Sequence, residues 1–396
     1  MSSALTLPAN ELFDRLASLD GAPLARDVRT SALERFFSLR SGREKPGRFW
    51  KVDFESLLPD AAAIDLGAAS VSVENADSRV LVCDIATAAR DHPELFARAF
   101  ATTGIPATKF GALAMAFAGA GVFIHVPPDH SCDEPIVISS SAPDGAAIFP
   151  WNVVLAERGA RVTVVERLTG DAGAFICGAA EVVTAEHAEV TYATLQATGE
   201  GVRVVSSRAA RPGRDASIAL ASAELGGQVA ASDLLVSIEQ PGAQIQITAL
   251  FFPRASQHVD VVSTVEHRAG EASSETMVKS AATENGQARF LGNIRIAPHA
   301  QGSDARLRDD ALLLSATAHV DSVPALEIGA NDVKAYHGAT VGAIDAEQIF
   351  YMESRGIDRS AAERMIALGF FEPAIARFPT GRLRDEIRAA LAAKLS

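Results

Sequence analysis

A repeat of about 28 residues runs through the middle of the sequence and constrains the fold more than any other feature. Each repeat holds an alanine followed by alternating apolar residues, and the alanines stand at Ala160, Ala188, Ala216 and Ala243. The phase continues more weakly to Ala272, Ala300 and Leu326. A fixed period in this range is typical of a solenoid, in which each repeat buries its apolar face against the next.

Each period contains two short alternating stretches, such as residues 191–196 and 202–206. Two strands per period suit one coil of a parallel β-helix, whose inward Val, Ile and Leu side chains form a continuous core. Small residues at the turns let successive coils approach closely. A β-sandwich also has recurring strands, but it does not require one in-phase alanine per period. We therefore predict a mainly β protein with a parallel β-helix core over residues 121–343.

Helical patterns flank this core on both sides. Apolar residues recur at helical spacing in residues 11–19, 31–39, 92–100 and 110–118, with strand-like alternation at 71–85 between them. Residues 346–352, 360–368 and 383–395 are also helix-like. We expect an N-terminal mainly helical segment (1–120), the β-helix (121–343) and a C-terminal helical domain (344–396). Because an open stack leaves unpaired backbone groups at its ends, we expect the helices to cap those ends.

A set of short blocks follows the last repeat. Leu-Glu-Ile stands at 326–328, Asn-Asp-Val-Lys at 331–334 and His-Gly-Ala-Thr at 337–340, followed by Phe350-Tyr351 and Ser-Arg-Gly-Ile at 354–357. This succession resembles the C-terminal signature of the SufB/SufD family, the scaffold subunits of the Suf iron–sulfur cluster assembly machine. Gly338 resembles the D-type pattern, because the B-type subunit has Glu there. A weaker resemblance, to the family's N-terminal Trp-Lys block, lies at residues 49–53.

The resemblance implies a non-catalytic, D-type scaffold subunit with a right-handed parallel β-helix between helical segments. Its partners would be SufB and the ATPase SufC, with a homodimer as a further form of the isolated chain. SufC would dock on the C-terminal helical end, at the block Phe350, Tyr351, Ser354, Arg355 and Gly356. No cofactor would be tightly bound by the chain alone, and iron or a transient iron–sulfur cluster would be shared with SufB.

His337 is the residue that we expect to handle iron or a cluster. The sequence predicts short strands at 326–328 and 333–336, joined by a turn at Asn331-Asp332, and a tight return between Gly338 and Gly342. His337 would then lie in a short turn at the end of the solenoid. A neutral imidazole can ligate iron, and the resemblance places the family's histidine at the interface between the B-type and D-type subunits. Family members often carry Cys at the position of Ala335, so any role of that thiol is missing here.

Composition and motifs exclude several function classes. The net charge of −13 argues against a nucleic-acid binder and against docking on anionic membranes. No run of about eighteen apolar residues predicts a membrane span, and the first residues lack the apolar core of a signal peptide, so we expect a cytoplasmic protein. The sequence has no P-loop of the GxxxxGK[ST] type. Any ATP that drives the system would therefore be bound by a partner.

The cysteines and other metal-ligand residues give weaker signals. Cys83, Cys132 and Cys177 are scattered, whereas an iron–sulfur cluster usually needs about four thiolate or imidazole ligands. We expect three small buried side chains. The block Gln257-His258-Val-Asp260, followed by Glu266-His267, could form a metal corner if His258 and Asp260 share the face of one strand, or a polar outer face.

A β-helix carbohydrate-active enzyme is the alternative from another class. Some parallel β-helix proteins cleave polysaccharides with carboxylate clusters, and Asp304, Asp309 and Asp310 are the candidates here. The aromatic content of 6% offers few platforms for sugar stacking, and the expected absence of an export signal also argues against this alternative.

Overall fold

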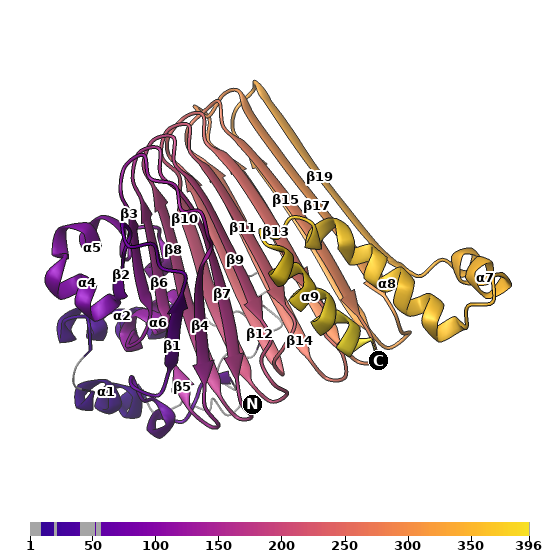
Figure 1. The fold of residues 1–396 in the computed structure, drawn as a ribbon, viewed down its shortest axis with the longest axis horizontal. Coiled ribbons are helices and arrows are strands. Elements are labelled where there is room, and N and C mark those ends of the chain that lie inside the picture. Colours follow the sequence, from indigo (N-terminus) through magenta and orange to yellow (C-terminus); the bar gives the residue numbers. More distant parts are fainter. Residues whose placement is uncertain (1–8, 20–21, 40–51, 53–56, 396) are drawn as a thin grey trace.

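The computed structural model of the protein describes residues 9–19, 22–39, 52 and 57–395. Most of the Trp-Lys block at 49–53 lies outside these residues. Two long sheets face each other, and the chain enters them alternately to form a parallel β-helix of about eight turns (Figure 1). Helical segments precede and follow the β-helix in the chain, so the predicted fold class is confirmed.

Sheet I contains nine strands, and their order in the sheet is their order in the sequence. They are β1 (Ser70–Glu74), β4 (Ile136–Ala142), β7 (Arg161–Gly170), β9 (Glu189–Gln196), β11 (Ser217–Glu224), β13 (Gln244–Phe251), β15 (Ser273–Ala282), β17 (Ser303–Leu313) and β19 (Val333–Ala343).

Sheet II has ten strands and is built in the same way. They are β2 (Leu81–Asp84), β3 (Val122–Val126), β5 (Ala147–Ile148), β6 (Trp151–Ala156), β8 (Phe175–Thr184), β10 (Arg203–Arg211), β12 (Val229–Ile238), β14 (His258–His267), β16 (Gln287–Ile296) and β18 (His319–Ile328).

The in-phase alanines mark one corner of the solenoid. Ala160, Ala188, Ala216 and Ala243 are fully buried, and each immediately precedes a strand of sheet I. Their carbonyl groups accept hydrogen bonds of 2.8–2.9 Å from backbone N–H groups of the next coil. The residue before each alanine has a positive φ, at Gly159, His187, Asp215 and Gly242. The repeat therefore encodes a left-handed turn residue followed by a side chain small enough for coil-to-coil contact.

The interior is apolar for most of its length but also contains charged groups. Arg208 of β10 is buried and donates to Glu224 at 2.8 Å. Glu166 of β7 accepts hydrogen bonds from Tyr192 and Asn152, at 3.0 and 2.9 Å. Burial raises the pKa of Glu166, while the charge of Arg208 opposes that rise. These buried ions are compensated by hydrogen bonds and opposite charge, as burial requires.

The N-terminal segment closes the first coil and covers sheet II. β1 pairs antiparallel with β4, and β2 pairs antiparallel with β3, so each sheet begins with a reversed strand. A hydrophobic cluster joins the helical segment to outward side chains of sheet II, among them Phe123, Trp151 and Phe175. The helices are α1 (Ala9–Ser18), α2 (Arg26–Ser38), η1 (Ala61–Ala63), α4 (Ile85–Asp91), α5 (Pro93–Ala99), η2 (Ile105–Ala107) and α6 (Lys109–Phe117).

Glu181 of β8 fastens this helical segment to the sheet. Its carboxylate accepts hydrogen bonds from the backbone N–H groups of Ala101 and Thr103, at 2.6 and 3.1 Å. The Thr103 hydroxyl and the Trp151 indole also donate to it, at 2.6 and 2.9 Å. One buried carboxylate therefore satisfies four donors where the chain leaves α5.

The C-terminal helices lie on the outer face of sheet I. α8 (Arg359–Ile375) and α9 (Gly381–Lys394) pack on that face. Phe371 of α8 and Ile387 of α9 are buried there in one cluster with Phe252, which follows β13. α7 (Ala346–Ser354) projects to one side as an arm (Figure 1). No helix in the described part of the chain is long and apolar enough to cross a membrane.

The expectation that helices cap both ends is wrong at the C-terminal end. α8 and α9 cover a face of the solenoid, and β18 and β19 form the outermost positions of their sheets. Most residues of these two strands are exposed or half-buried. The helices α8 and α9 pack on the outer face of sheet I because that face carries apolar side chains. They therefore do not cover the last coil.

Candidate functional site

The open end of the solenoid is the first candidate site. Among the described strands, β19 pairs with β17 on one side only, and β18 pairs with β16 on one side only. Tyr336 and Val341 on β19, with Val323 and Ile328 on β18, are exposed apolar or aromatic side chains. Unpaired backbone groups beside exposed apolar side chains are a template for another strand.

His337 lies in the middle of β19, so its predicted place in a short turn is wrong. The strand runs unbroken from Val333 to Ala343, and Gly338 and Gly342 lie within it. The turn at Asn331-Asp332 falls where the sequence predicted it, between β18 and β19, and the predicted strands at 326–328 and 333–336 lie within β18 and β19. The ladder with β17 continues through the glycines, and this backbone pairing accounts for the extended conformation.

His337 points the same way as the solenoid core. It stands opposite Leu307 in the parallel register, and Leu307 is a buried residue of the interior cluster. Val333 and Ala335 share this side of β19 by strand alternation and pack against that cluster. His337 is nevertheless exposed, because no further coil covers this end. An imidazole is therefore presented on an unfinished core face.

Gly338 allows the Tyr336 side chain to lie along the outer side of β19. A Cβ atom at position 338 would fall 2.6 Å from the Tyr336 hydroxyl oxygen. A larger residue at position 338 would displace the Tyr336 ring, which costs little because the ring is exposed.

Asp309 is a second ionisable group near the open end, and sequence reasoning did not connect it with His337. It lies on β17, one strand before β19, and is fully buried. Ser322 of β18 donates a hydrogen bond to its Oδ2 atom, while Oδ1 is buried without a partner. Burial raises the pKa of Asp309 to about 7. The inward phase of β17, with Ala305 and Leu307, is the signal that could have identified it.

The three aspartates proposed for a carbohydrate enzyme do not form a cluster. Asp304 pairs with Arg306 at 2.8 Å, and Asp310 pairs with Lys279 at 2.9 Å on the outer face. Asp309 faces the interior instead. These three aspartates therefore do not supply paired carboxylates for sugar cleavage.

The Gln257-His258-Asp260 block does not present a free carboxylate. Asp260 is fully buried, and Arg289 donates to both of its oxygens, at 3.1 and 3.2 Å. His267 is buried and hydrogen-bonded to Ser274 at 2.8 Å, and burial lowers its pKa to about 4. An ion pair and a neutral core histidine explain these residues better than a metal corner does.

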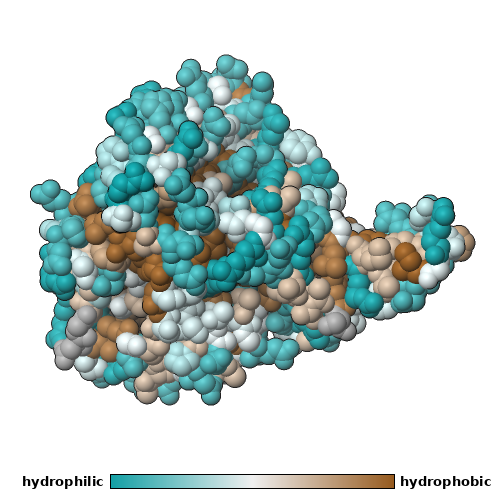
Figure 2. All heavy atoms as spheres, viewed as in Figure 1, coloured by the Kyte–Doolittle hydropathy of each residue, from teal (hydrophilic) through white to brown (hydrophobic). Residues whose placement is uncertain are grey.

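The projecting helix α7 is the second candidate site. Ile349 is buried, whereas Phe350 is 72% exposed and Tyr351 is 59% exposed. The Arg355 guanidinium lies 5.3 Å from the centre of the Tyr351 ring, and Ser354 donates to the Tyr351 carbonyl at 2.7 Å. Figure 2 shows apolar surface on this arm.

Gly356 ends this arm. It has a φ of 83°, in the left-handed region that favours glycine, and its N–H donates to the Glu353 carbonyl at 2.9 Å. All five residues of the predicted block, Phe350, Tyr351, Ser354, Arg355 and Gly356, are thus exposed on or just after α7.

Comparisons with known proteins place this architecture in a family. A family model described as SUF system FeS cluster assembly, SufBD core domain, matches residues 137–370, which is more than half of the chain. The chain belongs to the SufBD family. The match covers the solenoid from β4 onward, together with α7 and most of α8.

Individual SufBD relatives agree with this placement. The Bacillus subtilis iron–sulfur cluster assembly protein SufD is 28% identical over 334 residues, which are 82% of this chain and 76% of the relative. The Escherichia coli SufD is 38% identical over 162 residues, 41% of this chain and 37% of the relative. A SufBD family protein of Mycobacterium tuberculosis is 27% identical over 365 residues, 90% and 89% of the two chains. The two SufD matches support the D-type assignment made from Gly338.

Proposed function

We propose that this chain is a non-catalytic scaffold subunit of iron–sulfur cluster assembly that pairs with a B-type subunit, SufB, through β18 and β19. Iron or a nascent cluster is handled at that interface, with His337 as this chain's ligand. The ATPase SufC docks on the surface formed by Phe350, Tyr351, Ser354, Arg355 and Gly356. Membership of a family of assembly proteins supports the general role.

The open edge of β19 is the observation that carries the pairing proposal. A strand from a partner can add to β19 by main-chain hydrogen bonds, and exposed side chains such as Tyr336 and Val341 give specificity. Adding a partner strand also covers the backbone groups that an edge leaves open to aggregation.

The position of His337 supports its role at the interface. A neutral imidazole is a common metal ligand, and this one is exposed on the side of β19 that continues the interior. Because position 335 is Ala, this chain offers no thiolate beside it. The remaining ligands of an iron ion or cluster would therefore come from the partner, as thiolate or carboxylate groups.

The exposed aromatic residues of α7 support docking of a partner there. Aromatic and Arg side chains dominate the binding energy of many interfaces, and Phe350, Tyr351 and Arg355 lie together on one arm. The sequence has no P-loop, so the ATPase activity of the system belongs to that partner.

A co-purification experiment tests this proposal. The chain is expressed with SufB and SufC, and Val341→Lys places a charge on the edge of β19. We expect SufB recovery to fall by at least about tenfold while SufC recovery is unchanged, because Lys on an edge strand opposes strand addition. Val28→Lys, at an exposed position of α2, is the matched control. Undiminished recovery of SufB with Val341→Lys would contradict pairing through this edge.

The same edge is open to a second copy of the chain when SufB is absent. We propose a homodimer through β19 for the isolated protein. Sedimentation of the wild type should then show a dimer that Val341→Lys converts to a monomer, and an unchanged species would exclude this edge from self-association.

A further inference from the structure

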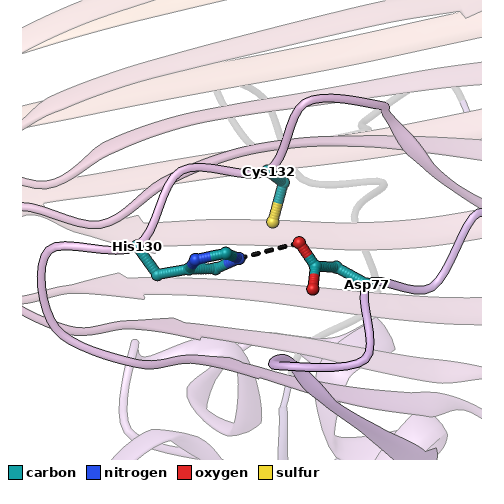
Figure 3. Close-up of side chains that lie close together, drawn as sticks. All are labelled: Asp77, His130 and Cys132. Carbon is teal, nitrogen blue, oxygen red and sulfur yellow. Dashed lines mark hydrogen bonds and ion pairs between the residues drawn. The ribbon is translucent and has the colours of Figure 1, made fainter.

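Asp77, His130 and Cys132 form a cluster of metal-ligand side chains at the opposite end of the solenoid from β19 (Figure 3). Asp77 lies in the connection between β1 and β2, while His130 and Cys132 lie in the connection between β3 and β4. β1 pairs with β4 and β2 pairs with β3. The two connections therefore meet where the reversed N-terminal strands join the first coil.

The backbone holds all three residues in place. The Arg161 N–H donates to the His130 carbonyl at 2.8 Å, and the Cys132 N–H donates to the Arg161 carbonyl at 2.9 Å. These bonds fix residues 130–132 in an extended form, so the imidazole and the thiol lie on the same side. Asp77 Oδ1 accepts the backbone N–H of Arg79 at 2.9 Å, which turns Oδ2 toward His130.

The ligand atoms are close enough to share one ion. Asp77 Oδ2 lies 2.9 Å from His130 Nε2, and the carboxylate oxygen, the imidazole nitrogen and the sulfur all lie within 4.8 Å of one another. His130 is buried, and Asp77 and Cys132 are half-buried. The Cys132 thiol makes no hydrogen bond to any described residue, so nothing in this part of the chain occupies the sulfur.

We infer that Asp77, His130 and Cys132 bind a divalent transition-metal ion of the Zn²⁺ or Fe²⁺ class. Carboxylate, imidazole and thiolate are the ligand types that such borderline-soft ions accept in tetrahedral sites. A carboxylate and a thiolate balance a +2 charge in this partly buried place. Three protein ligands leave one coordination position for water.

A nucleophilic role for Cys132 fits the geometry less well. The imidazole of an activated Cys–His pair takes the proton of the thiol, but His130 Nε2 is already bonded to Asp77. Burial, with Asp77 and Asp133 nearby, raises the pKa of the Cys132 thiol to about 11. A metal ion reverses this local effect, because it binds the thiolate.

The ion would join the N-terminal cap to the first coil. Asp77 belongs to the cap and the other two ligands to the coil, so binding adds a cross-link that the unfolded chain lacks. This role is independent of cluster assembly at His337.

The test is titration of the untagged, reduced protein with Co²⁺ under anaerobic conditions, followed by displacement with Zn²⁺. We expect one equivalent of Co²⁺ to give a thiolate-to-cobalt charge-transfer band and the visible bands of a tetrahedral site. Zn²⁺ should raise the thermal midpoint of the same protein. Cys132→Ser should abolish the charge-transfer band, and Asp77→Asn should weaken Co²⁺ binding by at least about tenfold.

Three controls separate this site from others. Cys83→Ser, at another half-buried thiol, should keep the band, as should His337→Ala. Arg79→Gln should tighten binding, because the exposed Arg79 guanidinium lies 3.5 Å from Asp77 Oδ2 and competes as a cation. A circular dichroism spectrum without metal verifies the fold of each variant. Wild-type protein without a thiolate band, or a band retained by Cys132→Ser, would overturn the inference.

Discussion

The two ends of the β-helix are built from the same coil but finished in opposite ways. At the N-terminal end, reversed strands β1 and β2 pair with the first coil, and helices cover the outer face of sheet II. At the C-terminal end, β18 and β19 are uncovered. Trp151 near the first end is 0% exposed, whereas Tyr336 on the last strand is 58% exposed.

This difference suggests that one end of the solenoid serves the stability of the chain and the other end serves partner binding. Edge strands are normally covered, shortened or charged, because an open edge attracts other chains. The outermost strands at the first end, β1 and β2, are only 5 and 4 residues long, whereas β19 and β18 are 11 and 10 residues long and carry exposed apolar side chains. The longer edge is therefore better suited to a partner strand. We therefore assign the stability of the isolated chain mainly to the N-terminal half and its partner contacts to the C-terminal half.

The largest expected effect is on the free energy of unfolding, when one aromatic residue at each end of the solenoid is replaced by Ala. Trp151→Ala should lower the free energy of unfolding by about 3–5 kcal/mol, because it leaves a cavity and removes a donor from Glu181. Tyr336→Ala should change it by about 0.5 kcal/mol or less. Urea unfolding of both variants measures the contrast. Equal losses would show that the last coil contributes to stability as much as the first.

The second expected effect is a pH dependence that originates near the open end. The pKa of Asp309 rises from 3.8 to about 7 on folding, so its contribution to stability is present below pH about 4 and is lost as the pH rises through 7. Asp309→Asn should therefore be more stable than wild type at pH 8, by about 2–4 kcal/mol, with the difference shrinking toward acid. Thermal midpoints from pH 5 to 8 test this, with Asp304→Asn, at a half-buried position on the other side of the same strand, as the control.

A smaller effect concerns the arm beyond the open end. Phe350→Ala with Tyr351→Ala should weaken SufC binding by about 10–100-fold and leave SufB pairing unchanged. Deleting everything from residue 345 is a poorer test, because α8 and α9 cover an apolar face of sheet I that contains Phe252. Pull-down of SufC by the double variant gives the measurement, and full binding would exclude α7 as the docking site.

The smallest effect on stability should come from His337→Ala. The side chain is exposed on an edge strand, so the free energy of unfolding should change by about 0.5 kcal/mol or less. Complex yield should remain near that of wild type, while the activity of iron–sulfur enzymes in the cell should fall, since Ala335 cannot replace the ligand. Early melting with loss of SufB would make His337 structural, and normal values in all assays would make it dispensable.

The repeat was readable from the sequence because every coil needs the same small residue at the same corner. Ala160 and its equivalents predict the coils, and the helix-like patterns at 346–352 and 360–368 fall within α7 and α8. Which helices cover which sheet face could not be predicted, because the outer apolar residues of a strand carry no information about which helix packs on them.

The surroundings of individual site residues could not be predicted from the sequence either. Glycines at 338 and 342 suggest a turn by local preference, but the ladder with β17 keeps the chain extended there. Asp309 differs from Asp304 and Asp310 only in its phase along β17, which requires the register. The Asp77, His130 and Cys132 cluster joins two connections about fifty residues apart, and only strand pairing brings them together.

The helices α8 and α9 lie across the coils like a strap. Arg167 of β7 pairs with Glu386 of α9 at 2.9 Å, and Glu275 of β15 pairs with Arg377 after α8 at 2.7 Å. Coils in a solenoid normally open one after another from a free end. We expect the strap to make the coils from β7 to β15 open together, whereas the coil of β18 and β19 lies outside these two ion pairs. Hydrogen exchange should then be fastest at the edge that a partner strand would occupy.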